Sequence, residues 1–136
     1  MPKAYLYLLN IMEIKDLTKA EEQLMQVLWQ LEKAFVKDVI DELPLPKPAY
    51  NTVSTIIRIL ETKGFIGHEA FGKAHQYFPL ISKEEYKRHA TEKLLGNYFE
   101  NSVESMFSFF VKEEKLDLSD VDEILKMIDK IKHKPK

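Results

Sequence analysis

Cysteine is absent from this chain of 136 residues, and glycine occurs only four times. Without cysteine the protein has neither a disulfide nor a thiolate metal site, which fits a reducing cytoplasm. So few glycines leave no glycine-rich phosphate loop and no GxSxG nucleophile elbow. The four histidines lack the HExxH spacing of a zinc enzyme. The sequence therefore predicts a cytoplasmic protein that is not an enzyme and that holds no metal and no other cofactor.

A long hydrophobic run is also missing. The most apolar stretch near the start, from Ala4 to Leu9, is far shorter than the roughly 20 residues that span a bilayer. No small-residue cleavage site follows it, so we expect neither membrane insertion nor secretion. A second methionine, Met12, directly precedes the first amphipathic segment. Residues 1–16 are therefore predicted to be a flexible extension, or to reflect a start site that really lies at Met12.

Strong net charge is lacking too, because 20 basic residues stand against 22 acidic ones. The charge is nevertheless segregated along the chain. Residues 1–46 contain five lysines and eight acidic residues, whereas residues 47–80 contain four basic and two acidic residues. The near-neutral total favours a protein-interaction module, and the basic middle segment favours nucleic-acid binding.

Capping and periodicity predict two short helices after residue 16. Thr18 and Glu21 fit a capping box that starts a helix ending near Glu32. Apolar residues at i, i+3, i+4 and i+7 predict a second helix over residues 36–43. Residues 34–36, between the two helices, are too short for an independent strand but can pair at a sheet edge.

A third helix and a hairpin follow. The prolines of LPLPKP force a turn, after which a helix is predicted from about Ala49 to Lys63, with Gly64 as a left-handed C-cap. The stretches FIGHEA and AHQYFPL are rich in β-branched and aromatic residues and flank a turn at Gly72 and Lys73. Three helices closed by a small antiparallel sheet predict a winged helix-turn-helix over residues 17–81.

The third helix has two unlike sides. One side is a buried apolar stripe formed by Val53, Ile56, Ile57 and Leu60. The other carries short polar side chains, which are poor choices for a merely solvated helix. In a helix-turn-helix the second helix of the pair enters the major groove, where such side chains contact bases and phosphates. The predicted DNA-binding residues, the last two on the wing, are Tyr50, Asn51, Thr52, Ser54, Thr55, Arg58, Lys73 and His75.

The remainder, residues 82–132, is predicted to be helical and ends in a basic tail, residues 133–136. Ser82 and Glu85 repeat the capping box, a break is expected near Gly96–Asn97 or Asn101–Ser102, and Ser119 is expected to cap the last helix. About fifty residues cannot bury so many large side chains internally, so a second copy of the chain is the expected cover. The predicted dimerisation residues are Leu95, Tyr98, Phe99, Val103, Met106, Phe107, Phe110, Ile124 and Ile128.

Three segments carry a resemblance to a known family: LTKAEEQLMQVLWQLEKAFVKDVIDEL, NTVSTIIRILETKGFIGHEAFGKAHQYFPLISKEEY and FFVKEEKLDLSDVDEIL. The sharpest pieces are TVSTIIRILETKGF, GKAHQYFPLIS and SKEEY. Over about residues 17–131 the chain resembles the penicillinase-repressor family, which includes a copper-responsive branch. The resemblance implies a mainly α protein, a homodimeric transcriptional repressor that binds a palindromic operator in double-stranded DNA. It implies operator contacts by Asn51, Thr52, Thr55, Arg58 and Lys73. The alternative is a winged-helix protein-protein interaction module without sequence-specific DNA binding.

The resemblance also implies a membrane-bound sensor protease as a partner in derepression, and here the chain departs from the family. Family members are cleaved at an Asn-Phe bond in the dimerisation region, whereas the matching position is Phe109–Phe110, preceded by Ser108. The usual cleavage site is therefore missing. The paired cysteines of the copper-responsive branch are missing as well, so copper sensing is not predicted.

Overall fold

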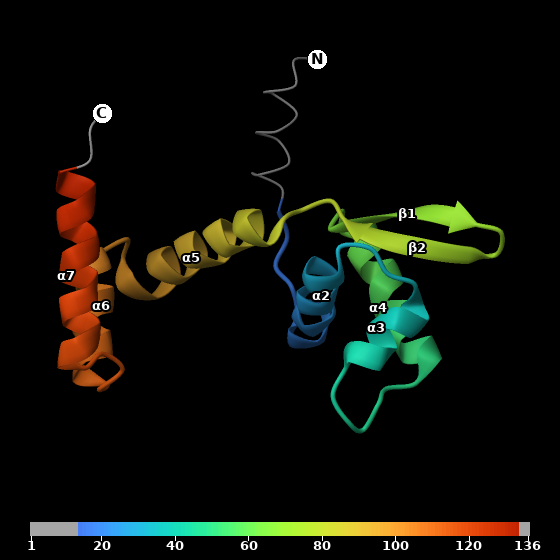
Figure 1. Ribbon diagram of the computed structural model, residues 1–136, viewed down its shortest axis with the longest axis horizontal. Coiled ribbons are helices and arrows are strands. Elements are labelled where there is room, and N and C mark those ends of the chain that lie inside the picture. Colours follow the sequence, from blue (N-terminus) through green and yellow to red (C-terminus); the bar gives the residue numbers. More distant parts are fainter. Residues whose placement is uncertain (1–13, 134–136) are drawn as a thin grey trace, which may run out of the picture. The chain divides into compact units, whose positions relative to one another are not determined.

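The computed structural model describes residues 14–133, in which six helices and two strands form two compact units. Figure 1 shows the order of these elements along the chain. The first unit ends at Ala90 and the second begins at Thr91. Most of the predicted extension, residues 1–16, lies outside the described residues. Its described end contributes Ile14, which is buried in the apolar core of the first unit.

Three helices form the body of the first unit: α2 (Lys19–Leu31), α3 (Val36–Glu42) and α4 (Tyr50–Thr62). The predicted capping box at the start of α2 is confirmed. The Thr18 hydroxyl accepts a hydrogen bond from the Glu21 N–H at 3.2 Å, and the Glu21 carboxylate accepts one from the Thr18 N–H at 3.1 Å. These two bonds satisfy donors that a helix N-terminus otherwise leaves free.

The predicted stripe of α4 points into the core. Val53, Ile57 and Leu60 are fully buried, and Ile56 is half-buried. Gly64, at φ 84°, lies just beyond the helix, as its predicted role requires. The core residues are Ile14, Leu24, Met25, Val27, Leu28, Ala34, Val36, Val39, Leu43, Val53, Ile57, Leu60, Phe65, Ile66 and Tyr77.

The predicted hairpin is also confirmed. Strand β1 (Ile66–Phe71) pairs in antiparallel fashion with β2 (Ala74–Pro79), and the turn between them places Gly72 at φ 63°. The short edge strand predicted between the first two helices is a single bridge, in which Ala34 and Tyr77 exchange backbone hydrogen bonds of 2.9 and 2.8 Å. The wing is thereby fixed to the turn between α2 and α3. The first unit is a winged helix.

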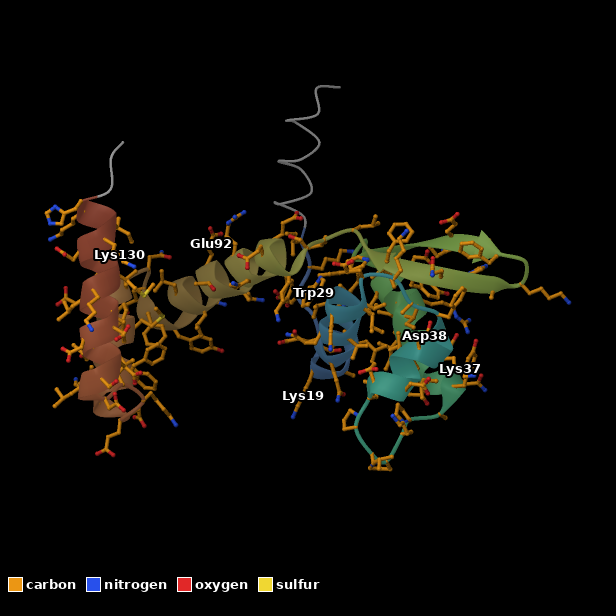
Figure 2. The ribbon with its side chains drawn as sticks, viewed as in Figure 1. Lys19, Trp29, Lys37, Asp38, Glu92 and Lys130 are labelled. Carbon is orange, nitrogen blue, oxygen red and sulfur yellow. The ribbon has the colours of Figure 1, made fainter. Side chains whose placement is uncertain are left out.

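Helix α5 (Lys83–Phe99) starts inside the first unit at the predicted Ser82–Glu85 capping box. The hydroxyl of Tyr86 accepts the N–H of Leu17 at 3.0 Å, and its ring lies 5.6 Å from that of Phe65. On α2, Trp29 (Figure 2) donates from Nε1 to the Ile81 carbonyl at 2.9 Å. The first turns of α5 are thus tied to the winged helix.

The second unit contains the end of α5 with α6 (Val103–Lys112) and α7 (Leu118–Lys132). The break between α5 and α6 covers residues 100–102, where Glu100 and Asn101 have φ of 52° and 62°, and so includes the second of the two predicted positions, Asn101–Ser102. The predicted cap of the last helix is wrong. Asp117, not Ser119, caps α7, because its carboxylate accepts the Asp120 N–H at 2.9 Å. Between residues 14 and 133, no helix combines the length and the apolar character needed to cross a membrane.

Candidate nucleic-acid interface

The exposed part of α4 divides into two strips. Tyr50, Ser54, Arg58 and Glu61 follow one another at helical spacing and face α3 and the hairpin, where they line one side of a groove. A second strip lies on the side of α4 that does not line this groove. It consists of the predicted residues Asn51, Thr52 and Thr55, all exposed. The structure therefore brings five of the eight predicted DNA-binding residues to the groove and leaves three beside it.

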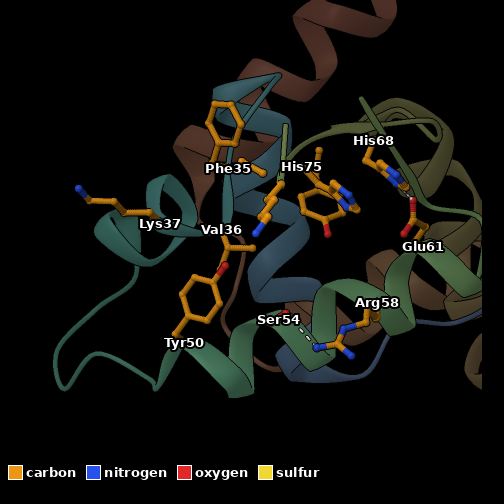
Figure 3. Close-up of a pocket in the computed structure, with 12 residues that line it drawn as sticks. Phe35, Val36, Lys37, Tyr50, Ser54, Arg58, Glu61, His68 and His75 are labelled. Carbon is orange, nitrogen blue, oxygen red and sulfur yellow. Dashed lines mark hydrogen bonds and ion pairs between the residues drawn. The ribbon is translucent and has the colours of Figure 1, made fainter. Parts of the chain in front are cut away.

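The groove has a volume of about 580 Å³ and opens between α4, the start of α3 and the hairpin (Figure 3). Its lining residues come from all three elements. They are Phe35, Val36, Lys37, Tyr50, Ser54, Arg58, Glu61, His68, Lys73, Ala74, His75 and Tyr77. Among these described residues, Lys37, Arg58 and Lys73 are cationic and Glu61 alone is acidic. This excess of positive charge suits a polyanion better than the near-neutral total charge suggests.

Local hydrogen bonds orient the polar side chains of α4. Arg58 Nη2 donates to the Ser54 hydroxyl at 3.2 Å, one turn back, which holds the guanidinium along the groove (Figure 3). The Thr55 hydroxyl donates to the Asn51 carbonyl at 2.8 Å. That bond leaves the oxygen of Thr55 as an acceptor and fixes its rotamer, while the Asn51 side chain stays exposed. These short side chains let the α4 backbone approach a ligand closely.

The hairpin side of the groove carries an arrangement that the sequence did not predict. His68 Nδ1 is hydrogen-bonded to the Glu61 carboxylate (Figure 3), and the ring of His68 stacks on His75 with centroids 4.2 Å apart and planes 8° apart. Tyr77 lies next to both rings, at 5.8 Å and 6.2 Å. Burial raises the pKa of Tyr77, the charge of Glu61 adds to the rise, and Arg58 opposes it. The phenol is therefore neutral near pH 7 where it lines the groove.

Seven lining residues were missing from the prediction: Phe35, Val36, Lys37, Glu61, His68, Ala74 and Tyr77. Lys37 lies in the first turn of α3, which sequence reasoning read only for its apolar stripe, although an exposed lysine ahead of the third helix was a usable signal. Glu61 and His68 belong to different elements, and no local pattern pairs them.

The far end of α4 is held by a partly buried ion pair. Lys63 Nζ lies 2.5 Å from the Glu21 carboxylate and donates to the Asp16 carbonyl at 3.1 Å. Burial raises the pKa of Glu21, but hydrogen bonds from Lys63 and Thr18 and the charge of Lys63 outweigh it, so the net shift is downward. The pair joins α4 to the first turn of α2 and so helps to fix the direction of α4 in the winged helix.

The predicted dimerisation residues all lie in the second unit. From Thr91 onward, none of the described residues is buried. Tyr98 is 76% exposed and Val103 51% exposed, although both are large and apolar. Phe107 and Ile128 are exposed, and Leu95, Phe99, Met106, Phe110 and Ile124 are half-buried. Across the part of the chain that the structure describes, no group of three or more histidine and acidic side chains is arranged to hold a metal ion.

The amino-acid sequence matches a known protein family. The profile of the family described as penicillinase repressor matches residues 17–130. The chain belongs to the penicillinase-repressor family. The methicillin resistance regulatory protein MecI of Staphylococcus aureus strain N315 is 24% identical over 116 residues, which cover 85% of this chain and 94% of MecI. The penicillinase repressor of Bacillus licheniformis is 23% identical over 125 residues, 91% of this chain and 98% of that protein.

A solved structure resembles part of this family member. The solution structure of the DNA-binding domain of the repressor BlaI is 28% identical and covers 54% of this chain and 90% of that domain, with a TM-score of 0.48.

Proposed function

We propose that this penicillinase-repressor family member is a cytoplasmic, homodimeric transcriptional repressor that binds a palindromic operator in double-stranded DNA. Helix α4 enters the major groove, and the β1–β2 hairpin lies against the sugar-phosphate backbone. One observation carries the proposal: α4 exposes a strip of short polar side chains directly beside a groove lined by three cations and one acid. Membership of a repressor family supports the same reading. We propose no catalytic activity and no cofactor.

The outer strip of α4 is suited to reading bases. Asn51 is exposed and offers the donor and acceptor pair that matches the major-groove edge of adenine. Thr52 and Thr55 present a methyl group and a hydroxyl oxygen, which fit the methyl group of thymine or a base-edge donor. We therefore assign sequence recognition to this strip, which has no bulky side chain to hold the helix away from the bases.

The groove is suited to phosphate. Arg58 supplies a fixed cation, Lys73 reaches out from the turn of the hairpin, and Lys37 adds a cation from α3, a residue that joins the predicted set. Tyr50 and His75 add hydrogen-bonding groups at the same surface. Such contacts raise the affinity for any duplex and set the position of α4 without reading sequence.

The second unit supplies the proposed dimer. Its large apolar side chains stay exposed in a single chain. A group of exposed apolar side chains is typical of a protein interface. A symmetric pair of chains would cover it and would present two α4 helices to two half-sites. Linking two half-site contacts raises the overall affinity through effective concentration.

A membrane-bound sensor protease is the proposed partner in derepression. The position that matches the family's cleavage site, Phe109–Phe110, lies within α6 and has Phe109 where the family has asparagine. Co-expression with a protease encoded beside this gene, followed by mass spectrometry of the fragments, tests this part. Intact chain after induction contradicts proteolytic release and leaves DNA binding unaffected.

Selection of bound fragments from the source genome by the purified full chain tests the DNA-binding function. A repressor enriches a few fragments that share an inverted repeat. The alternative, a protein-interaction module, is favoured by the near-neutral charge of the chain. A salt titration separates the two, because DNA affinity falls steeply with the logarithm of salt concentration and an apolar protein interface does not respond in this way. Absence of any enriched fragment at low salt would overturn the proposal.

A further inference from the structure

A pair of stacked imidazoles forms part of the hairpin side of the groove. His68 on β1 and His75 on β2 are diagonal neighbours, because His68 pairs with Tyr77 and His75 with Ala70 in the strand register. Both therefore lie on the face of the hairpin that lines the groove. Their rings stack with centroids 4.2 Å apart. The antiparallel register thus brings two imidazoles into direct contact at the groove.

The charged groups around this pair are unevenly distributed. From α4, Glu61 is hydrogen-bonded to His68 and Arg58 lines the same groove; Lys37 faces it from α3, and Lys73 from the turn. The remaining titratable groups that line the groove are Tyr50 on α4 and Tyr77 on β2, and burial raises the pKa of Tyr77. Among the described lining residues Glu61 is the sole anion. It can balance one charged imidazole, and it is already bound to His68.

A positive charge on His75 is therefore opposed by electrostatic repulsion in the free protein. Two charged imidazoles at stacking distance repel each other, and three further cations share the groove. An anion in the groove would remove this opposition, since a phosphate group binds charged donors more strongly than neutral ones.

We propose that His75, stacked on the Glu61-bound His68, is a proton-linked ligand for a backbone phosphate of DNA. The inference rests on the proposed DNA binding and adds a regulatory property to it. A phosphate that enters the groove supplies the second anion, and His75 takes up a proton as the complex forms. Because the bound state holds more protons than the free state, affinity rises as pH falls. One proton per half-site corresponds to a change of about tenfold per pH unit at each half-site in the limiting range.

The test measures DNA affinity between pH 8 and pH 6 at constant ionic strength, with the full chain and the selected duplex. We expect affinity to rise toward pH 6. Calorimetry in buffers with different ionisation enthalpies should show proton uptake close to one per half-site. A mixed-sequence duplex of the same length should show the same pH dependence, because a phosphate contact carries no base information. Affinity that does not change with pH would overturn the inference, since His75 would then act only as a neutral donor.

Three variants assign the effect to this residue. His75→Gln should lose the rise in affinity between pH 8 and pH 6, whatever its affinity at pH 8. His75→Lys carries a permanent charge and should keep high affinity at both pH values, which a merely structural role of His75 would not produce. His133→Gln, on an exposed histidine beyond α7, is the matched control and should keep the wild-type profile.

The outcomes separate this inference from the proposed function. If no duplex is bound at any pH, DNA binding itself is refuted. If the duplex is bound but His75→Gln retains the full pH dependence, only the role of His75 is refuted.

Discussion

At the scale of single residues, Arg58 combines a permanent positive charge with an exposed position in the groove. It lies outside the apolar core and donates a hydrogen bond to Ser54 on the same helix. Arg58→Ala should therefore leave the fold intact. Because the groove is assigned to phosphate, binding to all duplexes should weaken and the salt slope should drop by about one. Fluorescence anisotropy over a range of salt concentrations measures both quantities.

The control for Arg58 is Arg88→Ala, which removes the same charge from an exposed position on α5 that does not line the groove. That variant should bind as the wild type does. Equal losses for the two variants would mean that total charge, and not the position of Arg58, governs the affinity.

Glu21 is a residue whose protonation state matters for folding. It is only 6% exposed, and its side chain accepts hydrogen bonds from Lys63 and from the Thr18 backbone. Glu21→Gln keeps the shape of the side chain but removes the charge that these donors favour. We expect a loss of about 1.5–3 kcal/mol in the free energy of unfolding at pH 7. Urea unfolding measures it, and Glu22→Gln, on the exposed neighbouring position, is the control.

The same residue gives a pH dependence of definite sign. Because the pKa of Glu21 is lower in the folded chain than the ordinary value of 4.5, the folded state favours the ionised carboxylate. Its contribution is complete above pH 4.5 and is lost as the pH falls through the lowered pKa. The difference in unfolding free energy between the wild type and Glu21→Gln should therefore shrink as the pH falls below 4.5. A constant difference down to pH 3 would contradict this account.

At the scale of helices and strands, the sequence predicted what local signals control and missed what they do not. The Thr18 capping box and the turn at Gly72 are contained in a few consecutive residues, and both predictions are confirmed. The start of α7 was misjudged because Asp117 and Ser119 are both good caps, and the reciprocal bond with Asp120 decides between them. The groove could not be predicted, because it depends on how α3, α4 and the hairpin pack.

The end of α4 depends on one backbone conformation. Gly64 has φ 84°, a conformation that L residues other than asparagine rarely adopt. A β-carbon added at this position would meet nothing within 4 Å. Gly64→Ala should therefore cost about 1–2 kcal/mol through backbone strain alone. Thermal unfolding measures the loss. Gly64→Asn should cost less because asparagine tolerates this region, and equal losses for both would point to a side-chain clash instead.

At the scale of the whole molecule, the two units differ in how much apolar surface each buries. The first unit has a core of buried residues, whereas the described residues of the second have none. In a single chain, the apolar side chains of the second unit therefore stay in contact with water. Covering them with a second chain would be favourable through the hydrophobic effect. We therefore expect the second unit to set the concentration at which DNA is occupied, although its residues lie outside the groove.

Phe107 on α6 tests this dependence. It shares an apolar stripe with Val103, Met106 and Phe110, and Phe107→Asp would place a charge in the proposed interface. We expect sedimentation to show single chains and operator affinity to fall about 100-fold or more, because the two half-site contacts lose their linkage. Ser105→Asp adds the same charge off the stripe and should leave both measurements unchanged.

Because the first unit has its own core, single-half-site binding at high protein concentration should survive in Phe107→Asp. Loss of that binding would mean that the substitution has unfolded the chain, and full operator affinity in single chains would refute the coupling between dimerisation and DNA binding.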